Sequence, residues 1–143
     1  MCSSHATVRG LLHEIPADDR VVVVDTEASP EHLSRGTTEA VDVMLVVAEP
    51  YFKSLETARR YSGLGKDLGI SRVAVLANKV RSAEDETAIG EFCSSHGMEL
   101  LGGVPHDDAL STAERAGIAP IDHEPEGRSV QAIGRIVGKI LGA

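Results

Sequence analysis

The sequence is poor in aromatic residues and in cysteine. Its 143 residues include no Trp, two Tyr, two Phe and two Cys. Two cysteines are too few for a disulfide framework, which excludes the small disulfide-stabilised secreted domains. A reducing, cytoplasmic setting is therefore expected. Without large rings, the core must be built from Val, Leu, Ile and Ala.

Basic charge and long apolar runs are also scarce. The 14 Lys and Arg residues face 22 Asp and Glu, giving a formal net charge of -8. A general nucleic-acid binder needs a basic face to replace phosphate counterions, so no nucleic-acid partner is expected. No apolar run approaches the roughly 20 residues of a membrane span, and the N-terminus has no apolar signal core. No membrane partner is expected either.

What the sequence does have is an alternation of strand and helix patterns. Its length suits a single domain over residues 1–143. Four nearly continuous apolar runs predict strands that are covered on both faces, at residues 20–25, 43–48, 72–77 and 99–104. Strands that alternate with helices predict an α/β fold, a parallel sheet flanked by helices with right-handed crossovers.

The helices are predicted from apolar stripes and capping signals. One stripe at steps of three and four ends at Gly69; it consists of Leu55, Ala58, Tyr61, Leu64 and Leu68. Ser82 with Asp85 is a capping-box start for a helix through about Ser95. Shorter helices are expected before Pro16 and over residues 107–116, and residues 119–127 read as a surface loop. A closing helix is expected to bury Val130, Ile133, Val137, Ile140 and Leu141.

Ligands of open parallel sheets bind beyond the carboxyl ends of the strands. The polar residues there belong to the segments 25–29, 49–50, 78–81 and 105–108. Asp25 suits Mg²⁺, which takes hard oxygen ligands, although a strand-end Asp that caps the next turn has about equal weight. The Asn78 amide could read a purine or simply close a strand. Lys79 could equally lend its stem to packing and its charge to solvent.

The phosphate-binding loop that such a site needs is absent from these 143 residues. A P-loop requires G-x-x-x-x-G-K-[ST] directly after a strand. The segments Gly65-Lys66-Asp67 and Gly138-Lys139-Ile140 both lie within helical patterns and do not follow a strand. The histidines and cysteines form no cluster with zinc-ligand spacing.

Taken together, these motifs resemble the CooC family of nickel-insertion ATPases, which mature carbon monoxide dehydrogenase and belong to the MinD/ParA-like (SIMIBI) P-loop class. The resemblance rests on the continuous segment 25–37, on Val41-Asp42, on Glu49-Pro50 and on Asn78-Lys79-Val80-Arg81. It covers almost the whole chain. Its most specific element is Glu31-His32-Leu33-x-Arg35-Gly36-Thr37.

The resemblance implies a role for each matching residue. Asp25 corresponds to the aspartate that helps to hold Mg²⁺ and orders the attacking water. Asn78, with Lys79 beside it, corresponds to the element that recognises the base of ATP. The segment Thr26, Glu27, Ala28 and Ser29 corresponds to the switch that senses the γ-phosphate, and Pro105, His106 and Asp107 to the loop that closes over adenine.

The resemblance also implies a metal site and a partner. Cys2 matches the second cysteine of a Cys-x-Cys pair that binds Ni²⁺ or Zn²⁺ across the interface of a homodimer. The first cysteine would precede Met1, and the P-loop strand, which would lie between the strands of Asp25 and Val43, is missing. The chain is therefore expected to be the C-terminal portion of a MinD/ParA-like nucleotide-binding domain.

Three functions follow as hypotheses. The first is the C-terminal half of an ATP-hydrolysing metallochaperone for carbon monoxide dehydrogenase, inactive as an ATPase when isolated, because nothing replaces the lysine and amide cradle of the P-loop. The second keeps the class and changes the client to another metallocluster protein. The third is a non-catalytic module that binds a partner through its open sheet or N-terminal helix.

Overall fold

The structure, a computed structural model, describes residues 20–26 and 41–142. Within them, β1 (Val43–Ala48), β2 (Arg72–Val80) and β3 (Glu99–Pro105) form a parallel sheet in the order β1-β2-β3. Helix α3 (Phe52–Asp67) connects β1 to β2, and α4 (Ala83–Ser95) connects β2 to β3. The predicted α/β class, a parallel sheet flanked by helices, is confirmed.

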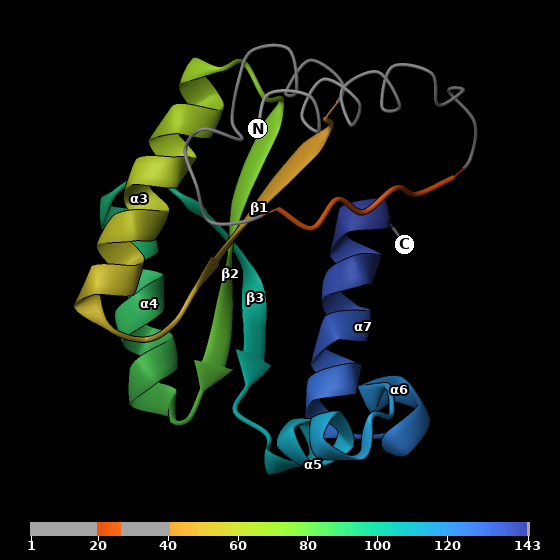
Figure 1. Ribbon diagram of the computed structural model, residues 1–143. Coiled ribbons are helices and arrows are strands. Elements are labelled where there is room, and N and C mark those ends of the chain that lie inside the picture. Colours follow the sequence, from red (N-terminus) through yellow and green to blue (C-terminus); the bar gives the residue numbers. More distant parts are fainter. Residues whose placement is uncertain (1–19, 27–40, 143) are drawn as a thin grey trace, which may run out of the picture.

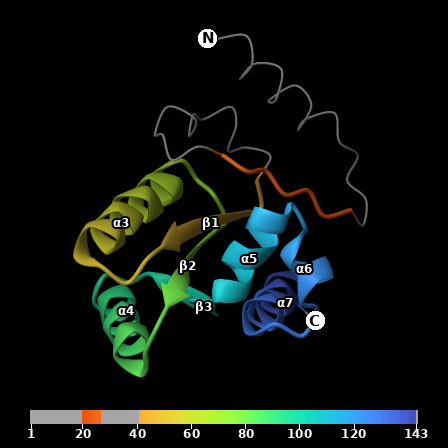
Figure 2. The ribbon, with the colours of Figure 1, turned by 60° about the horizontal axis from the view of Figure 1, so that its bottom comes forward.

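The helices form layers on both sides of the sheet. Helices α3 and α4 cover one face, and α7 (Arg128–Leu141) packs on the other face against β3 (Figures 1 and 2). The short helices α5 (Asp108–Ala116) and α6 (Pro120–His123) lie near the end of the sheet at which the strands finish (Figure 1). Residues 119–127, predicted as a loop, thus include one short helix.

The core is aliphatic, as the scarcity of aromatic residues requires. Under α3 and α4, the side chains of Val75, Ile89 and Cys93 are at most 1% exposed. Under α7, a smaller cluster contains Ala74, Leu101, Val104 and Ile136. Two of the chain's few aromatic residues lie outside the core: Tyr51 and Phe52, at the start of α3, are 55% and 72% exposed.

The predicted helix boundaries are confirmed closely. Helix α4 starts after Ser82, whose Oγ accepts a hydrogen bond from the Asp85 N–H at 3.2 Å. Helix α3 ends just before Gly69, which has a φ of 84°, a conformation that glycine adopts without steric cost. Helix α5 starts after Asp107, whose side chain accepts from the Ala109 N–H at 3.1 Å. Local capping chemistry therefore sets these boundaries.

The prediction of a buried strand at residues 20–25 is wrong. Residues 20–26 form no strand, and Val21 and Val23 are 63% and 87% exposed. A strand is stable only when a neighbour satisfies its backbone N–H and C=O groups. The neighbour that the family resemblance implies, the P-loop strand, has no counterpart in the sequence, and among the described residues no strand lies beside the valine run.

The buried face predicted for the closing helix is wrong in part. The residues of α7 that face the sheet are Ser129, Ala132 and Ile136, and Val130 and Ile140 are half-buried. Ile133, Val137 and Leu141 are exposed. The apolar stripe of α7 is wider than the surface it covers, and only one side of it packs on β3.

The second face of β1 is likewise uncovered, contrary to the expectation that all strands are covered twice. Leu45 and Val47 pair in register with Ala74 and Leu76, which pack under α7. Leu45 and Val47 therefore lie on the α7 side of the sheet, but they are 40% and 57% exposed. The helix predicted before Pro16 and the segment 31–37 lie outside the described residues. Among the helices described, none has the length and apolar character to span a membrane.

Candidate functional site at the carboxyl ends of the strands

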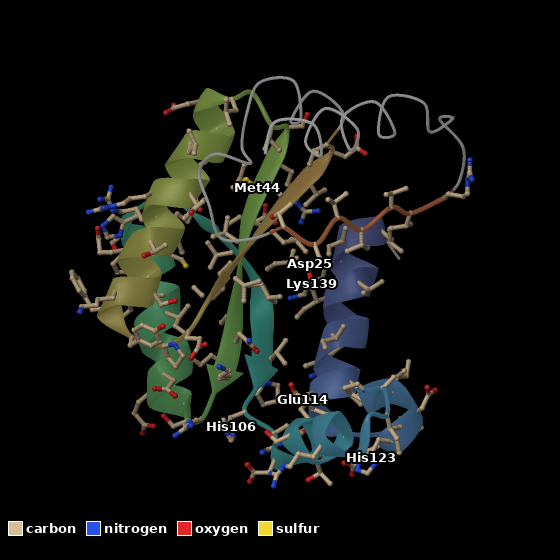
Figure 3. All side chains as sticks on the ribbon, viewed as in Figure 1. Asp25, Met44, His106, Glu114, His123 and Lys139 are labelled. Carbon is tan, nitrogen blue, oxygen red and sulfur yellow. The ribbon has the colours of Figure 1, made fainter. Side chains whose placement is uncertain are left out.

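The carboxyl ends of the three strands meet at one edge of the sheet, which is hereafter called the rim. Glu49 follows β1, and Asn78 and Lys79 lie in the last residues of β2. His106, which is labelled in Figure 3, follows β3. Lys79 Nζ lies 2.8 Å from Glu49 Oε1, and the His106 N–H donates to the Val80 carbonyl at 2.8 Å. These contacts join all three strand ends.

Asn78 and Lys79 form a β-bulge at the rim. Ala77 pairs with Gly103 and Val80 pairs with Pro105, so two residues of β2 oppose Val104 alone on β3. Strand β2 thus extends past the predicted end at Ala77. Lys79 has a φ of 56° and is the non-glycine residue with a positive φ in the described part of the chain. Bulges next to ligand sites re-aim side chains, and a non-glycine residue at positive φ marks local strain.

Asp107 connects the starts of two helices. One carboxylate oxygen accepts from the Ala109 N–H of α5 at 3.1 Å, and the other accepts from the Ser129 N–H of α7 at 3.4 Å. The Arg128 Nε lies 3.8 Å from that second oxygen. Both helix N-termini carry partial positive charge, so one carboxylate stabilises both.

The surroundings of Asp107 change its acidity. Burial opposes ionisation, but hydrogen bonds from Ala109 and Ser129 and the charge of Arg128 outweigh it and hold the pKa of Asp107 below its ordinary value. Asp107 is thus an anion, and its partners among the described residues lie at the starts of α5 and α7, where it has a structural role.

Two residues that support this loop were missed by the sequence analysis. The Ser129 Oγ donates to the Pro105 carbonyl at 3.0 Å, and the Arg128 guanidinium donates to the His106 carbonyl. Both residues lie at the start of α7, far from the loop in sequence. No local pattern marks them, because their role depends on how α7 docks.

Asp25, which Thr26 follows directly in the chain, is not brought to the rim in this structure. Asp25 lies at the level of Lys139, in the last turns of α7, whereas His106 lies at the other end of the sheet (Figure 3). Residues 20–26 are all exposed. Of the other predicted site residues, Glu27, Ala28, Ser29 and Cys2 lie outside the described residues.

No metal site is assembled by the residues that the structure describes. Nowhere in residues 20–26 and 41–142 do three or more His, Cys, Asp or Glu side chains gather to hold an ion. Mg²⁺ held through one carboxylate takes its other ligands from water and substrate phosphates, and Asp25 is an exposed carboxylate that lies away from the rim. The residues that the structure describes therefore do not by themselves complete a Mg²⁺ site. What the rim does offer is an oriented amide, an ion pair and a constrained loop after β3.

Comparison with known proteins gives relatives in sequence and in structure. The chain is 40% identical over 126 residues to the carbon monoxide dehydrogenase accessory protein CooC of Rhodospirillum rubrum, covering 87% of this chain and 47% of CooC. It is 42% identical over 118 residues to the uncharacterized ATP-binding protein MJ0823 of Methanocaldococcus jannaschii, covering 82% of this chain and 46% of that protein. A search with protein-family models finds no match. The chain spans about half the length of the curated relatives it matches.

Solved structures that resemble this one include MinD cell-division proteins and a ParA family ATPase. MinD from Pyrococcus horikoshii, solved with Mg-ADP, superposes with a TM-score of 0.68 at 14% identity, covering 95% of this chain and 56% of that one. MinD from Aquifex aeolicus gives 0.64 at 20% identity, covering 76% and 48%. The ParA family ATPase from Chlorobium tepidum gives 0.63 at 20% identity, covering 78% and 46%.

The chain therefore has the fold of the MinD/ParA-like P-loop ATPases. In sequence, the chain resembles CooC over 87% of its own length, which confirms the resemblance read from the motifs.

Proposed function

We propose that this chain is the C-terminal portion of a CooC-like, ATP-binding metallochaperone whose complete form delivers nickel to carbon monoxide dehydrogenase. The observation that carries the proposal is the 40% identity to CooC over 126 residues. The MinD/ParA-like fold and the rim around Asn78 are consistent with it. ATP is the substrate and nickel the cargo.

In this proposal the rim holds the base of the nucleotide. The Asn78 amide offers both a donor and an acceptor to a purine edge. Pro105, His106 and Asp107 form the loop over the base, fixed by Ser129 and Arg128. Lys79 contributes through its contact with Glu49 rather than through a phosphate.

The proposal assigns the open side of the sheet to the rest of the domain. The outer edge of β1 has no strand beside it among the described residues, and Leu45 and Val47 are exposed next to it. A P-loop strand added at that edge would also give residues 20–25 a neighbour. Asp25 would then reach the rim, act on Mg²⁺ and order the attacking water, with Thr26, Glu27, Ala28 and Ser29 following as the switch. Cys2 would supply one ligand for Ni²⁺ or Zn²⁺ per subunit of a homodimer.

The first test is the DNA directly upstream of the Met1 codon. The proposal expects an in-frame glycine-rich Gly-Lys-Thr segment and a Cys codon two positions before Cys2. A stop codon shortly upstream, in frame, would contradict it.

A biochemical test uses the chain itself. Because the chain lacks the lysine and amide cradle, we expect it to show no ATP turnover above background. The Asp25→Ala variant is expected to give the same background rate. Turnover that Asp25→Ala abolishes would contradict the proposal. Addition of adenosine is expected to shift the Asn78 and His106 resonances in NMR spectra, and an absence of shifts would count against the base site.

A second function is favoured by the exposed apolar side chains of β1 and α7. In it, the chain is a non-catalytic module that binds a full-length relative through this open side. Co-elution with a full-length CooC-like protein in size-exclusion chromatography would support it, and separate elution at micromolar concentrations would exclude it. A CooC-like ATPase that serves another metallocluster client differs from the first proposal only in which enzyme it activates.

A further inference from the structure

The bulge at the end of β2 has an unusual backbone conformation that requires stabilising contacts. Lys79 is left-handed, with a φ of 56°. A residue with a Cβ rarely adopts this backbone conformation. Its unfavourable free energy must be offset by local contacts. Residues with such strain concentrate at ligand sites, where the geometry matters more than stability.

The backbone of Lys79 orients the Asn78 amide. The Lys79 N–H donates to Asn78 Oδ1 at 3.0 Å. An amide rotated by half a turn would point its NH₂ group at this N–H, donor against donor. The bulge therefore fixes which end of the Asn78 side chain faces outward, which leaves the NH₂ donors and one oxygen lone pair for a ligand.

The side chain of Lys79 is held from the neighbouring strand. Lys79 Nζ lies 2.8 Å from Glu49 Oε1, which belongs to the residue following β1. Glu49 is itself fixed, because its N–H donates to Ser54 Oγ in the first turn of α3 at 2.9 Å. A continuous series of contacts thus runs from Ser54 through Glu49 and Lys79 to Asn78.

We propose that Glu49 is a positioning residue, which holds Lys79 in the left-handed bulge and thereby sets the orientation of the Asn78 amide for a purine. The use made of Asn78 rests on the proposed function; the positioning itself rests on the geometry of Glu49, Lys79 and Asn78. An exposed ion pair contributes little to global stability. The effect is therefore expected in the local conformation and in purine selectivity, rather than in unfolding.

The test compares Glu49→Gln with the matched variant Glu56→Gln in the ¹⁵N-labelled chain. Glu56 forms an exposed ion pair with Arg59 on α3, with an N–O distance of 3.0 Å, and does not contact the bulge. Glu49→Gln is expected to speed hydrogen exchange of the Lys79 N–H by about two- to fivefold, the range that corresponds to the loss of an exposed ion pair. It is also expected to move the Asn78 side-chain NH₂ resonances. Glu56→Gln is expected to do neither.

A rescue variant separates positioning from general loosening. Lys79→Gly removes the ammonium group but adopts positive φ freely, so it needs no anchor. In the Lys79→Gly background, Glu49→Gln is expected to add no change to the Asn78 resonances. If Glu49→Gln leaves the exchange of the Lys79 N–H and the Asn78 resonances of the wild-type background unaltered, or alters Asn78 equally in both backgrounds, the proposal is overturned.

Ligand titrations distinguish this inference from the proposed function. Adenosine carries an exocyclic N6 amine that purine riboside lacks, and this amine can donate a hydrogen bond to an oriented Asn78 Oδ1. Glu49→Gln is expected to reduce the preference for adenosine, and an undiminished preference would overturn the inference. If neither nucleoside shifts Asn78 in the wild-type chain, the base site fails, whereas the exchange rates alone still decide whether Glu49 positions Asn78.

Discussion

The two faces of the sheet are covered to very different extents. On the face under α3 and α4, Val46, Val73 and Val75 are at most 8% exposed. On the other face, α7 buries Ala74 but leaves Leu45 and Val47 of β1 open. Helices α3 and α4 are the connections between consecutive strands, and they cover the face on which they cross. The open face lies beside the strand edge that has no neighbour among the described residues. The poorly covered part of the sheet is therefore the part that also lacks a partner strand there.

The largest expected effect comes from replacing one isoleucine on each face of the sheet. Ile89→Ala, at a side chain that is 0% exposed under α4, is expected to lower the free energy of unfolding by about 2–5 kcal/mol. Ile133→Ala, on the exposed flank of α7, is expected to change it by about 0.5 kcal/mol or less. Urea unfolding followed by circular dichroism measures both. Equal losses would mean that the α7 flank is covered in solution.

Two glycines of α3 sharpen the contrast on a smaller scale. A Cβ on Gly65 would lie 2.7 Å from Met44 Sδ and 3.0 Å from Val73 Cγ2, so Gly65→Ala is expected to cost about 1–3 kcal/mol. A Cβ on Gly63 meets nothing within 4 Å, and Gly63→Ala is expected to stabilise by about 0.5–1 kcal/mol. Thermal unfolding of the two variants should move in opposite directions. A shift of the same sign would contradict the close packing at Gly65.

The rim allows the same comparison between two adjacent aspartates. Asp107, whose side chain is 11% exposed, caps α5 and contacts α7, whereas the side chain of Asp108 is 95% exposed. Asp107→Ala is expected to cost about 0.5–2 kcal/mol at neutral pH, and Asp108→Ala much less. The measurement is the urea midpoint of each variant.

The pH dependence of Asp107→Ala has a definite sign. Because the pKa of Asp107 is lowered in the folded state, its stabilisation is present above the ordinary carboxyl pKa and is lost as the pH falls through the folded value. The difference between wild type and Asp107→Ala should therefore shrink in acid. A difference that persists at low pH would assign the effect to the side chain's volume rather than to its charge.

The smallest expected effect lies at the opposite ends of the strands. Arg72 at the start of β2 and Glu99 at the start of β3 form an ion pair with a shortest N–O distance of 2.6 Å, which lowers the pKa of Glu99. Both side chains are partly exposed, so salt screens the pair. Glu99→Gln should lower the urea midpoint less than Asp107→Ala does. Added salt should remove the difference in midpoint between wild type and Glu99→Gln. A salt-independent loss would imply a role beyond charge.

The fold was predictable where the sequence signals are local. The stripe that ends at Gly69, the Ser82–Asp85 cap and the run at Val43–Ala48 all gave elements within about two residues of those observed. Hydrophobic patterning and capping act over a few residues, so they can be read without tertiary information. The valine run at residues 20–25 shows the limit: its composition suits a strand, but a strand also needs a neighbour.

The candidate site was predictable only in outline. The principle that ligands bind beyond strand ends identified Asn78, Lys79 and the loop after β3, and the resemblance to CooC added roles that remain predictions. The bulge, the positive φ of Lys79 and the support from Arg128 and Ser129 were not foreseen. Each depends on strand register or on helix docking between residues far apart in the chain.

The absence of Trp and the exposure of Phe52 together have a practical consequence. Phe52 begins α3 just beyond the end of β1, and its side chain is 72% exposed. Phe52→Trp would therefore place a single indole fluorophore near the rim without disturbing the core. Its emission would report nucleotide addition or partner docking optically, with no background from any other indole in the chain.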